Sequence, residues 1–224
     1  MASPSAPPPV KLICGMLSAR GELLDLARGE LAAHFGPVDI VSEIMDFDFT
    51  HYYDRQMGSP LLRQFVSFAE LVPPEALAQA KHATNAMETA IAARGVAGIL
   101  PSLVHGHAGD SAGETPATPR ATPRPINLDP GYVDSPKLVL ASMKNFAHRV
   151  YLGQGVYAEV TLLHRRGRWT PLDWTFPDYA SGRYWPFLDQ VRRRLREQLA
   201  SGQVPAGGRG GAPLPTPQRP EKHA

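Results

Sequence analysis

The sequence predicts an α+β fold, and two observations lead to this class. Short apolar runs rich in β-branched residues alternate with longer segments in which apolar residues recur every three or four positions. The first pattern is typical of buried strands and the second of amphipathic helices, and Gly or Pro residues separate them. At 224 residues, the chain is long enough to bury a core of ordinary size.

Three segments are rich in Pro and Gly, and we expect them to be disordered. They are residues 1–9, an insertion at 101–125 that contains the run PATPRATPRP, and the tail at 200–224. Segments of this composition lack the apolar periodicity needed to bury enough surface to offset their loss of chain entropy. We interpret the remainder, residues 10–199 without the insertion, as a single domain.

The first half of this domain begins with a strand and a helix. The apolar run Val10–Leu17 predicts a buried strand, and Gly21–Phe35 predicts a helix that Gly36-Pro37 ends. One face of that helix is apolar and consists of Leu24, Ala27, Leu31 and Phe35. Val38–Phe49 and Leu61–Val72 are predicted as the second and third strands.

The next segments complete a β-α-β-β-α-β order. Pro73-Pro74 starts a long helix that ends at Gly95. Ile126–Asp129 is a brief fourth strand that ends at a Pro130-Gly131 turn. Two right-handed crossovers in this order give an antiparallel sheet with both helices on one face, which is the ferredoxin-like plan.

Beyond this ferredoxin-like βαββαβ core, the sequence predicts an added helix, a β-hairpin and a C-terminal helix. Ser135 at a cap position and Pro136 in the first turn favour a helix through about Asn145, although KLVLA alone could form a strand. A hairpin, a last strand and the closing helix follow, over His148–Leu152 with Val156–His164, Trp169–Leu172 and Tyr184–Leu199.

Charge is distributed unevenly between the two halves of the domain. Residues 10–100 carry 11 acidic and 7 basic side chains, whereas residues 126–199 carry 7 acidic and 11 basic ones. A uniformly basic domain would suggest nucleic acid as a partner. The opposite net charges of the two halves instead suggest that the halves attract each other, or that acidic and basic side chains meet at a site.

Cysteine content and hydropathy bear on the compartment. Cys14 is the single cysteine, which excludes an internal disulfide, and its apolar surroundings predict a small buried side chain. The N-terminus lacks the apolar core of a signal peptide, and no apolar run reaches the roughly 18 residues of a transmembrane helix. We therefore expect a cytoplasmic protein with no membrane partner.

Four carboxylates are candidate ligands for a hard cation such as Mg²⁺. Strand alternation places Asp46 and Asp48 on one side at a strand end, and Asp129 stands at another strand end. Glu159 lies at strand-face spacing between Tyr157 and Thr161, where a carboxylate needs a partner. A solvated strand end, a turn-forming Asp and a structural ion pair are the simpler explanations.

A second cluster could bind phosphate or move protons. Lys144 and His148 are the candidate catalytic groups, and Arg149 is a candidate phosphate ligand. Candidate substrate contacts on and near the hairpin are aromatic, namely Tyr151, Tyr157 and Trp174. Ordinary packing, or a cation that suits a helix end, explains these residues equally well.

Two histidines in the insertion could also chelate a metal. His105 and His107 are separated by one glycine, but such pairs in disordered segments usually have no role.

Several motifs together resemble a known family. The basic half contains the stretch NLDPGYVDSPKLVLASMKNFAHRVYLGQGVYAEVTLL, followed by LDWTFPDY. The acidic half contains MDFDFTHYYDRQMG, the SFAEL strand and the strand at Lys11–Leu17. These motifs resemble a prokaryotic family catalogued as domain of unknown function 4416, and the insertion at 101–125 looks peculiar to this chain. Some relatives are labelled as GTP-binding, whereas this sequence has no G-x-x-x-x-G-K-S/T loop.

The functional hypothesis is a protein that binds a nucleotide or phosphorylated small molecule, with metal-dependent phosphoryl or nucleotidyl transfer as its enzymatic form. An alternative is a non-catalytic RNA- or protein-binding module that uses the hairpin and the arginines of the closing helix, Arg192, Arg193, Arg194 and Arg196. A homo-oligomeric structural component is a third alternative, because an exposed hairpin edge invites pairing.

Overall fold

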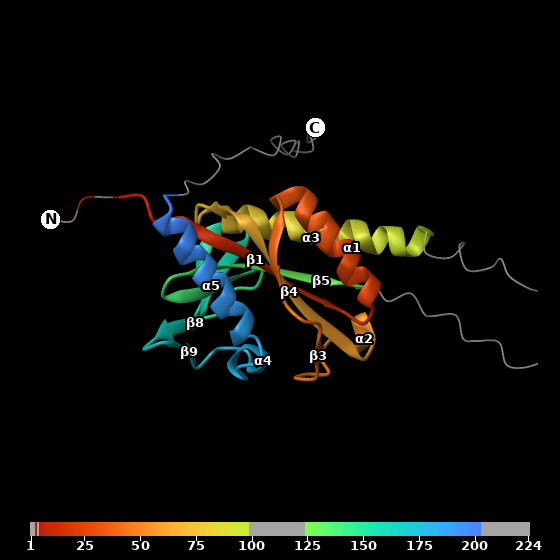
Figure 1. The fold of residues 1–224 in the computed structure, drawn as a ribbon. Helices are drawn as coiled ribbons and strands as arrows, with labels where there is room; N and C mark the ends of the chain where they lie inside the picture. The colour runs from red at the N-terminus through yellow and green to blue at the C-terminus, as the bar shows by residue number, and fades with distance from the viewer. Residues whose placement is uncertain (1–2, 4, 99–123, 203–224) are drawn as a thin grey trace, which may run out of the picture.

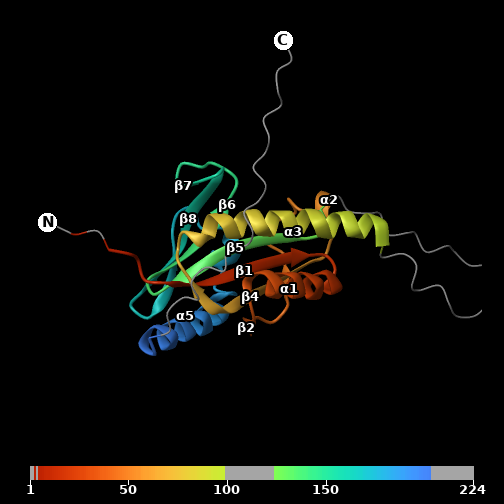
Figure 2. The ribbon, with the colours of Figure 1, turned by 90° about the horizontal axis from the view of Figure 1, so that it is seen from above.

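The computed structural model describes residue 3, residues 5–98 and residues 124–202 (Figure 1). These residues form one nine-stranded sheet with helices on both faces. Figure 2 shows α1 (Gly21–Phe35) and α3 (Ala76–Gly98) on one face and α5 (Trp185–Ala200) on the other. The expected α+β class is therefore confirmed. No helix in this described part has the length and apolar character needed to cross a bilayer.

The remaining elements are short helices and the strands of the sheet. The helices α2 and α4 cover Asp54–Met57 and Pro177–Ala180. The strands are β1 (Val10–Ser18), β2 (Val38–Val41), β3 (Met45–Phe47), β4 (Leu61–Val72), β5 (Asn127–Asp134), β6 (Lys137–Ser142), β7 (Val150–Gly153), β8 (Val156–Arg165) and β9 (Arg168–Pro171).

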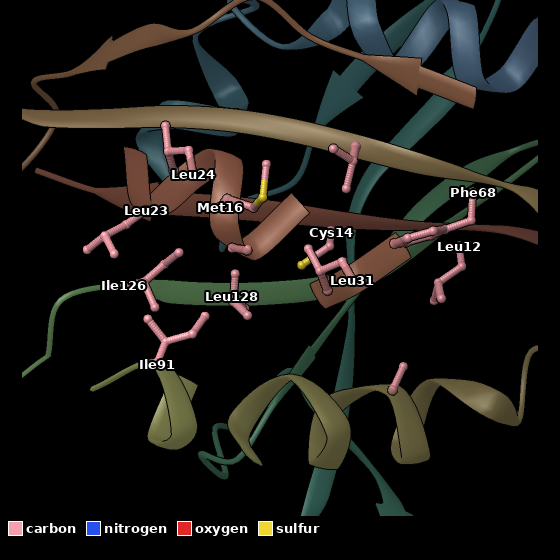
Figure 3. Packing of buried hydrophobic residues seen from close by; sticks show 13 residues of the cluster. Leu12, Cys14, Met16, Leu23, Leu24, Leu31, Phe68, Ile91, Ile126 and Leu128 are labelled. Carbon is pink, nitrogen blue, oxygen red and sulfur yellow. The ribbon is translucent and has the colours of Figure 1, made fainter. Parts of the chain in front are cut away.

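Strand β1 lies at the centre of the sheet, between β4 and β5. The strand order is β2-β4-β1-β5-β6-β8-β7, with β3 also paired to β4 and β9 to β8, and all the pairings are antiparallel. Alternate residues of β1 point to opposite layers. Leu12, Cys14 and Met16 contact the α1 and α3 layer (Figure 3), whereas Ile13 belongs to the core beneath α5.

Several predicted elements coincide with those observed. The helix over Gly21–Phe35 and the strand over Leu61–Val72 have the predicted ends. The predicted apolar face of α1 is buried through Leu24, Ala27 and Leu31. In these segments the local pattern and the buried environment favour the same structure.

The helix predicted from Ser135 to Asn145 is wrong. Residues Lys137–Ser142 form β6, which lies between β5 and β8, and both faces of this strand are covered. Ser135 and Pro136 lie in the β5–β6 turn, where the Ser135 amide donates to Asp134 Oδ1 at 2.6 Å. The residues expected to cap a helix therefore form a turn, because flanking strands stabilise the apolar run KLVLA as a strand.

Two other sequence interpretations also need correction. The predicted Pro130-Gly131 turn is wrong, since both residues lie within β5, opposite Cys14 and Ile13 of β1. The predicted strand Val38–Phe49 is divided into β2 and β3, which both pair with β4. At the break, the Ser42 amide donates to the Phe65 carbonyl at 2.9 Å, so the chain stays attached to the sheet edge.

Much of the three segments predicted to be disordered lies outside the described residues. This holds for residues 101–123 of the insertion, including His105 and His107, for the tail from 203, and for residues 1, 2 and 4. Arg124 and Pro125, at the end of the predicted insertion, are placed, and Ser18 Oγ donates to the Pro125 carbonyl at 2.8 Å.

Gly131 allows β6 to approach β5 closely. A Cβ atom at this position would lie 2.5 Å from the Val139 carbonyl oxygen and 2.6 Å from Leu140 Cδ2. We expect Gly131→Ala to lower the free energy of unfolding by about 2 kcal/mol, because backbone and core must shift to admit the methyl group. Urea denaturation measures this change.

A matched glycine substitution serves as the control. A Cβ atom at Gly29, in the exposed part of α1, meets no atom within 4 Å, so Gly29→Ala should raise stability by about 0.5–1 kcal/mol through helix propensity alone. Equal effects of the two substitutions would contradict the proposed close approach of β5 and β6.

Cys14 is expected to be chemically inert in the folded protein. It is 1% exposed, and burial raises the pKa of its thiol well above the usual range, so the reactive thiolate is suppressed. A thiol-reactive chromogenic disulfide at about pH 8 should react only after unfolding in denaturant. Rapid stoichiometric reaction under native conditions would show that the α1 and α3 layer opens readily.

Candidate functional site

A cleft of about 920 Å³ opens where β5 and β6 separate. The ladder between these strands runs from Asp134 opposite Lys137 to Gly131 opposite Leu140. Beyond that point β5 continues along β1 and β6 continues along β8. Asp129 of β5 and Ser142 of β6 line the opening, together with residues of α3 and α4. Because α3 and α4 lie on opposite faces, the cleft extends from one helical layer to the other.

Arg63 of β4 occupies the buried end of the cleft. It is 4% exposed, and its Nη1 and Nη2 atoms each lie 3.5 Å from a carboxylate, on Asp129 and Asp178 respectively. These distances are long for charge-assisted hydrogen bonds, which are usually below about 3 Å. Its Nε atom is buried and has no hydrogen-bond partner among the described residues. The guanidinium therefore retains unused donor capacity.

Asp129 is held by cations from several elements. Its Oδ2 accepts a hydrogen bond from Asn127 Nδ2 at 2.5 Å, and its Oδ1 lies 3.7 Å from Lys81 Nζ. Burial opposes ionisation of this carboxyl, but Lys81, Arg63 and Arg124 outweigh burial and lower its pKa. Asp129 is therefore a carboxylate at neutral pH.

Two other cleft carboxyl groups are shifted in the opposite direction. Burial raises the pKa of Asp178, against the opposing charge of Arg63 and a hydrogen bond from Tyr184. Burial also raises the pKa of Glu88, although its oxygens accept from the Leu128 amide at 2.7 Å and from Arg124 at 3.0 Å. The cleft thus combines carboxyl groups of different acidity beside two arginines, Arg63 and Arg124, an arrangement that can bind charged groups and exchange protons.

A second polar cluster supports the β6–β7 wall of the cleft. Glu159 of β8 is 3% exposed and accepts from Arg149 Nε at 2.7 Å, and His148 Nε2 lies 3.0 Å from the same oxygen. Arg149 also donates to Ser142 Oγ at 2.7 Å and to the Lys144 carbonyl at 2.9 Å. These contacts fix the loop that carries Lys144.

Aromatic rings form much of the remaining lining. The rings that line the cleft are Phe47, Phe49, Tyr52, Tyr53, Phe146, Phe176 and Tyr179. Tyr179 is 3% exposed, and its hydroxyl has no hydrogen-bond partner among the described residues. Lys144 is exposed at the mouth, with its Nζ 5.7 Å from the centre of the Tyr52 ring. Flat apolar groups and anions can therefore both be accommodated.

The structure brings some of the residues predicted from the sequence into this cleft. Lys144, Arg149, Asp129 and Glu159 line it. His148 lies beside it, stacked on Trp174 with ring centres 5.4 Å apart. Tyr151 and Tyr157 contact each other on the β7–β8 hairpin at 5.2 Å, and they are not among the lining residues.

The four predicted metal ligands are not brought together. Asp48 is 66% exposed and pairs with Arg183 at 2.9 Å, and the same Arg183 nitrogen donates to the main-chain carbonyl of Asp46 rather than to its carboxylate. Asp129 and Glu159 have separate cationic partners. Within the described ranges, no group of three or more His, Cys, Asp or Glu side chains is placed to hold a metal ion.

Sequence reasoning missed several residues of the cleft. These are Arg63, Lys81, Glu88, Arg124, Asp178 and Tyr179. A detectable signal existed for two of them, because Arg63 interrupts the apolar strand Leu61–Val72 and Lys81 follows the inward-facing Ala80 of α3. A charge inside an apolar run needs a buried partner or a cavity.

Removal of the Glu159 carboxylate tests its structural role. Glu159→Ala leaves the Arg149 guanidinium, whose side chain is 4% exposed, without its anion. We expect a loss of about 3 kcal/mol in unfolding free energy by chemical denaturation. Asp48→Ala breaks an exposed carboxylate–arginine pair and should leave stability nearly unchanged. Similar effects of both substitutions would contradict the assignment of Glu159 as a buried anchor.

Comparison with known proteins identifies a family. The sequence profile of the family described as domain of unknown function (DUF4416) matches residues 8–107 and 114–195. Only residues 108–113 separate the two matched parts, so the expectation that the whole insertion at 101–125 is peculiar to this chain is wrong. Neither a curated protein nor a solved structure matches the chain. Since the profile covers most of the sequence, the chain belongs to the DUF4416 family.

Proposed function

We propose that the cleft between β5 and β6 binds a small anionic molecule with a planar group, of the nucleotide class. The cleft is lined by five cations and four acidic side chains, which leaves a small excess of positive charge; the cations are Arg63, Lys81, Arg124, Lys144 and Arg149, and the acids are Glu88, Asp129, Glu159 and Asp178. Aromatic rings lie among these cations, and a ring face can stack on a base. The volume of about 920 Å³ falls within the usual range of small-molecule sites.

The observation that carries the proposal is the pair of unsatisfied donors in the buried part of the cleft. Arg63 Nε and the Tyr179 hydroxyl are both buried and have no partner within the described residues. A buried donor without an acceptor costs about 1–3 kcal/mol, so native proteins rarely retain one without a use. A phosphate or carbonyl oxygen of a ligand would satisfy such donors.

The same geometry favours binding over metal-dependent transfer. Asp46 and Asp48 lie outside the lining, and the cleft carboxylates are paired with cations. We therefore propose that Mg²⁺, where present, enters with the nucleotide phosphates rather than through a ligand set of the protein.

Two broader assignments accompany this proposal. The order β2-β4-β1-β5, with α1 and α3 on one face, supports a ferredoxin-like plan for the first part of the domain. The single cysteine, which is free and buried, supports a cytoplasmic location.

Thermal unfolding with AMP, ATP and GTP, with and without MgCl₂, tests the proposal. A nucleotide at about 100 times its Kd should stabilise the fold by about 2.7 kcal/mol, which corresponds to a rise in Tm of about 5–10 °C. Lys144→Glu should weaken binding by about tenfold, since it reverses a charge at the mouth. Arg28→Glu, on the outer side of α1, should leave the Kd unchanged.

Tyr179→Phe provides a second, more specific test of nucleotide binding. It removes a buried hydroxyl that lacks a partner, so the unliganded protein should keep or gain stability. Nucleotide affinity should nevertheless fall, because the ligand loses a donor. The proposal fails if none of the nucleotides shifts Tm at millimolar concentration, or if Lys144→Glu and Tyr179→Phe both bind as the unmodified protein does.

A further inference from the structure

A cationic surface lies apart from the cleft, on the outer side of α5 and the β8–β9 turn. Figure 1 shows this hairpin beside α5. Its residues, which we call the arginine surface, are Arg165, Arg166, Arg168, Arg192, Arg193, Arg194 and Arg196. A shallow groove of about 560 Å³ joins the two segments, with His164 and Gly167 on one side and Arg192, Arg193 and Arg196 on the other.

The fold holds both segments in place from beneath. Leu188, Val191 and Leu195 of α5 are buried, so Arg193, Arg194 and Arg196 occupy the outer face of the helix. Arg192 is half-buried at the edge of this face, and its Nε donates to the Ser135 carbonyl at 2.7 Å. Trp169 of β9 is 2% exposed, and its Nε1 donates to Asp189 Oδ1 at 2.9 Å, which attaches the hairpin to α5.

Most of this positive charge is not neutralised within the protein. In the part of the chain that the structure describes, Arg194 is the one member of the arginine surface with a carboxylate within 4 Å, from Asp39 and Glu197. The groove itself is lined by two acidic residues, Asp189 and Glu197, and by three arginines, Arg192, Arg193 and Arg196. Burial and then the charge of Arg192 lower the pKa of His164, Asp189 opposes this change, and Arg196 adds to it.

We propose that the arginine surface binds the phosphate backbone of a double-stranded nucleic acid. Arginine recognises phosphate through paired hydrogen bonds, and α5, with 16 residues, is about 24 Å long, enough to follow several phosphates. The described residues lining the groove include no Phe, Tyr or Trp, so there is no platform on which single-stranded bases would stack.

A protein partner fits this surface less well. Protein interfaces have an apolar centre, usually with aromatic residues. The large exposed hydrophobic residues of the described chain belong to other segments, including Val150, Tyr151 and Leu152 of β7. The arginine surface offers charge without such a centre, which suits a polyanion.

Fluorescence anisotropy with labelled duplexes of about 20 base pairs tests the proposal, using RNA and DNA in separate titrations. With about four phosphate contacts, affinity should fall about a hundredfold between roughly 50 and 200 mM NaCl. The triple variant Arg165→Glu/Arg168→Glu/Arg193→Glu should weaken binding by about a hundredfold or more at the lower salt concentration.

A second triple variant controls for net charge. Arg20→Glu/Arg28→Glu/Arg94→Glu makes the same change in charge with arginines of the α1 and α3 side, which are half-buried or exposed and lie away from α5. Its duplex affinity should stay within about threefold of the unmodified protein. Both triple variants should keep the native circular dichroism spectrum, and the control should lose a little thermal stability because each of its arginines has a carboxylate partner.

Four outcomes would overturn the proposal. They are absence of duplex binding at low salt, binding that does not depend on salt, equal losses in the two triple variants, and tighter binding of a poly-glutamate peptide or single strand than of a duplex. The duplex experiment tests a surface outside the cleft, so a negative result would not contradict the nucleotide proposal. A negative result with nucleotides would likewise not contradict the duplex proposal.

Discussion

The candidate site depends on the point at which β5 and β6 stop pairing. From Gly131 and Leu140 outward, β5 stays with β1 and β6 stays with β8, so the sheet itself divides. Pro130 stands at this division and has no amide proton to offer a further neighbour. Beyond this point the backbone groups and side chains of β5 and β6 no longer contact each other. They need other partners, which the polar residues that line the cleft supply.

Two buried cations in this protein show the difference between a structural charge and an available one. Lys11 is fully buried, and its Nζ contacts the Phe68 carbonyl at 2.6 Å, Gln198 Oε1 at 2.9 Å and Asp39 Oδ2 at 2.7 Å. Phe68 and Gln198 accept hydrogen bonds from the ammonium group, Asp39 forms an ion pair with it, and the Gln198 contact attaches α5 to the sheet. Arg63 is almost as buried, yet its contacts are long and one donor has no partner. Only the second arrangement leaves capacity for a ligand.

The sequence predicted the structure correctly where the local pattern of apolar residues and the environment of the folded segment favour the same element. The ends of α1 and β4 follow from apolar spacing, and Lys144, Arg149, Asp129 and Glu159 stand out as charges near apolar strands. The helix predicted from Ser135 failed because β6 is stabilised by β5 and β8, which are distant pairings that no local pattern contains. Arg63 and Asp178 were missed for the same reason, since 115 positions separate the partners of one ion pair.

The charge polarity of the sequence has two different origins in the structure. In the cleft, charges from both halves are close to balanced, as with Lys81 of α3 beside Asp129 of β5. The basic excess of the second half is instead concentrated on α5 and the β8–β9 turn, where few carboxylates neutralise it. Net charge along a sequence therefore cannot distinguish a site where opposite charges meet from a surface that carries one sign. Burial makes that distinction, because a buried charge must be paired whereas an exposed one is solvated by water.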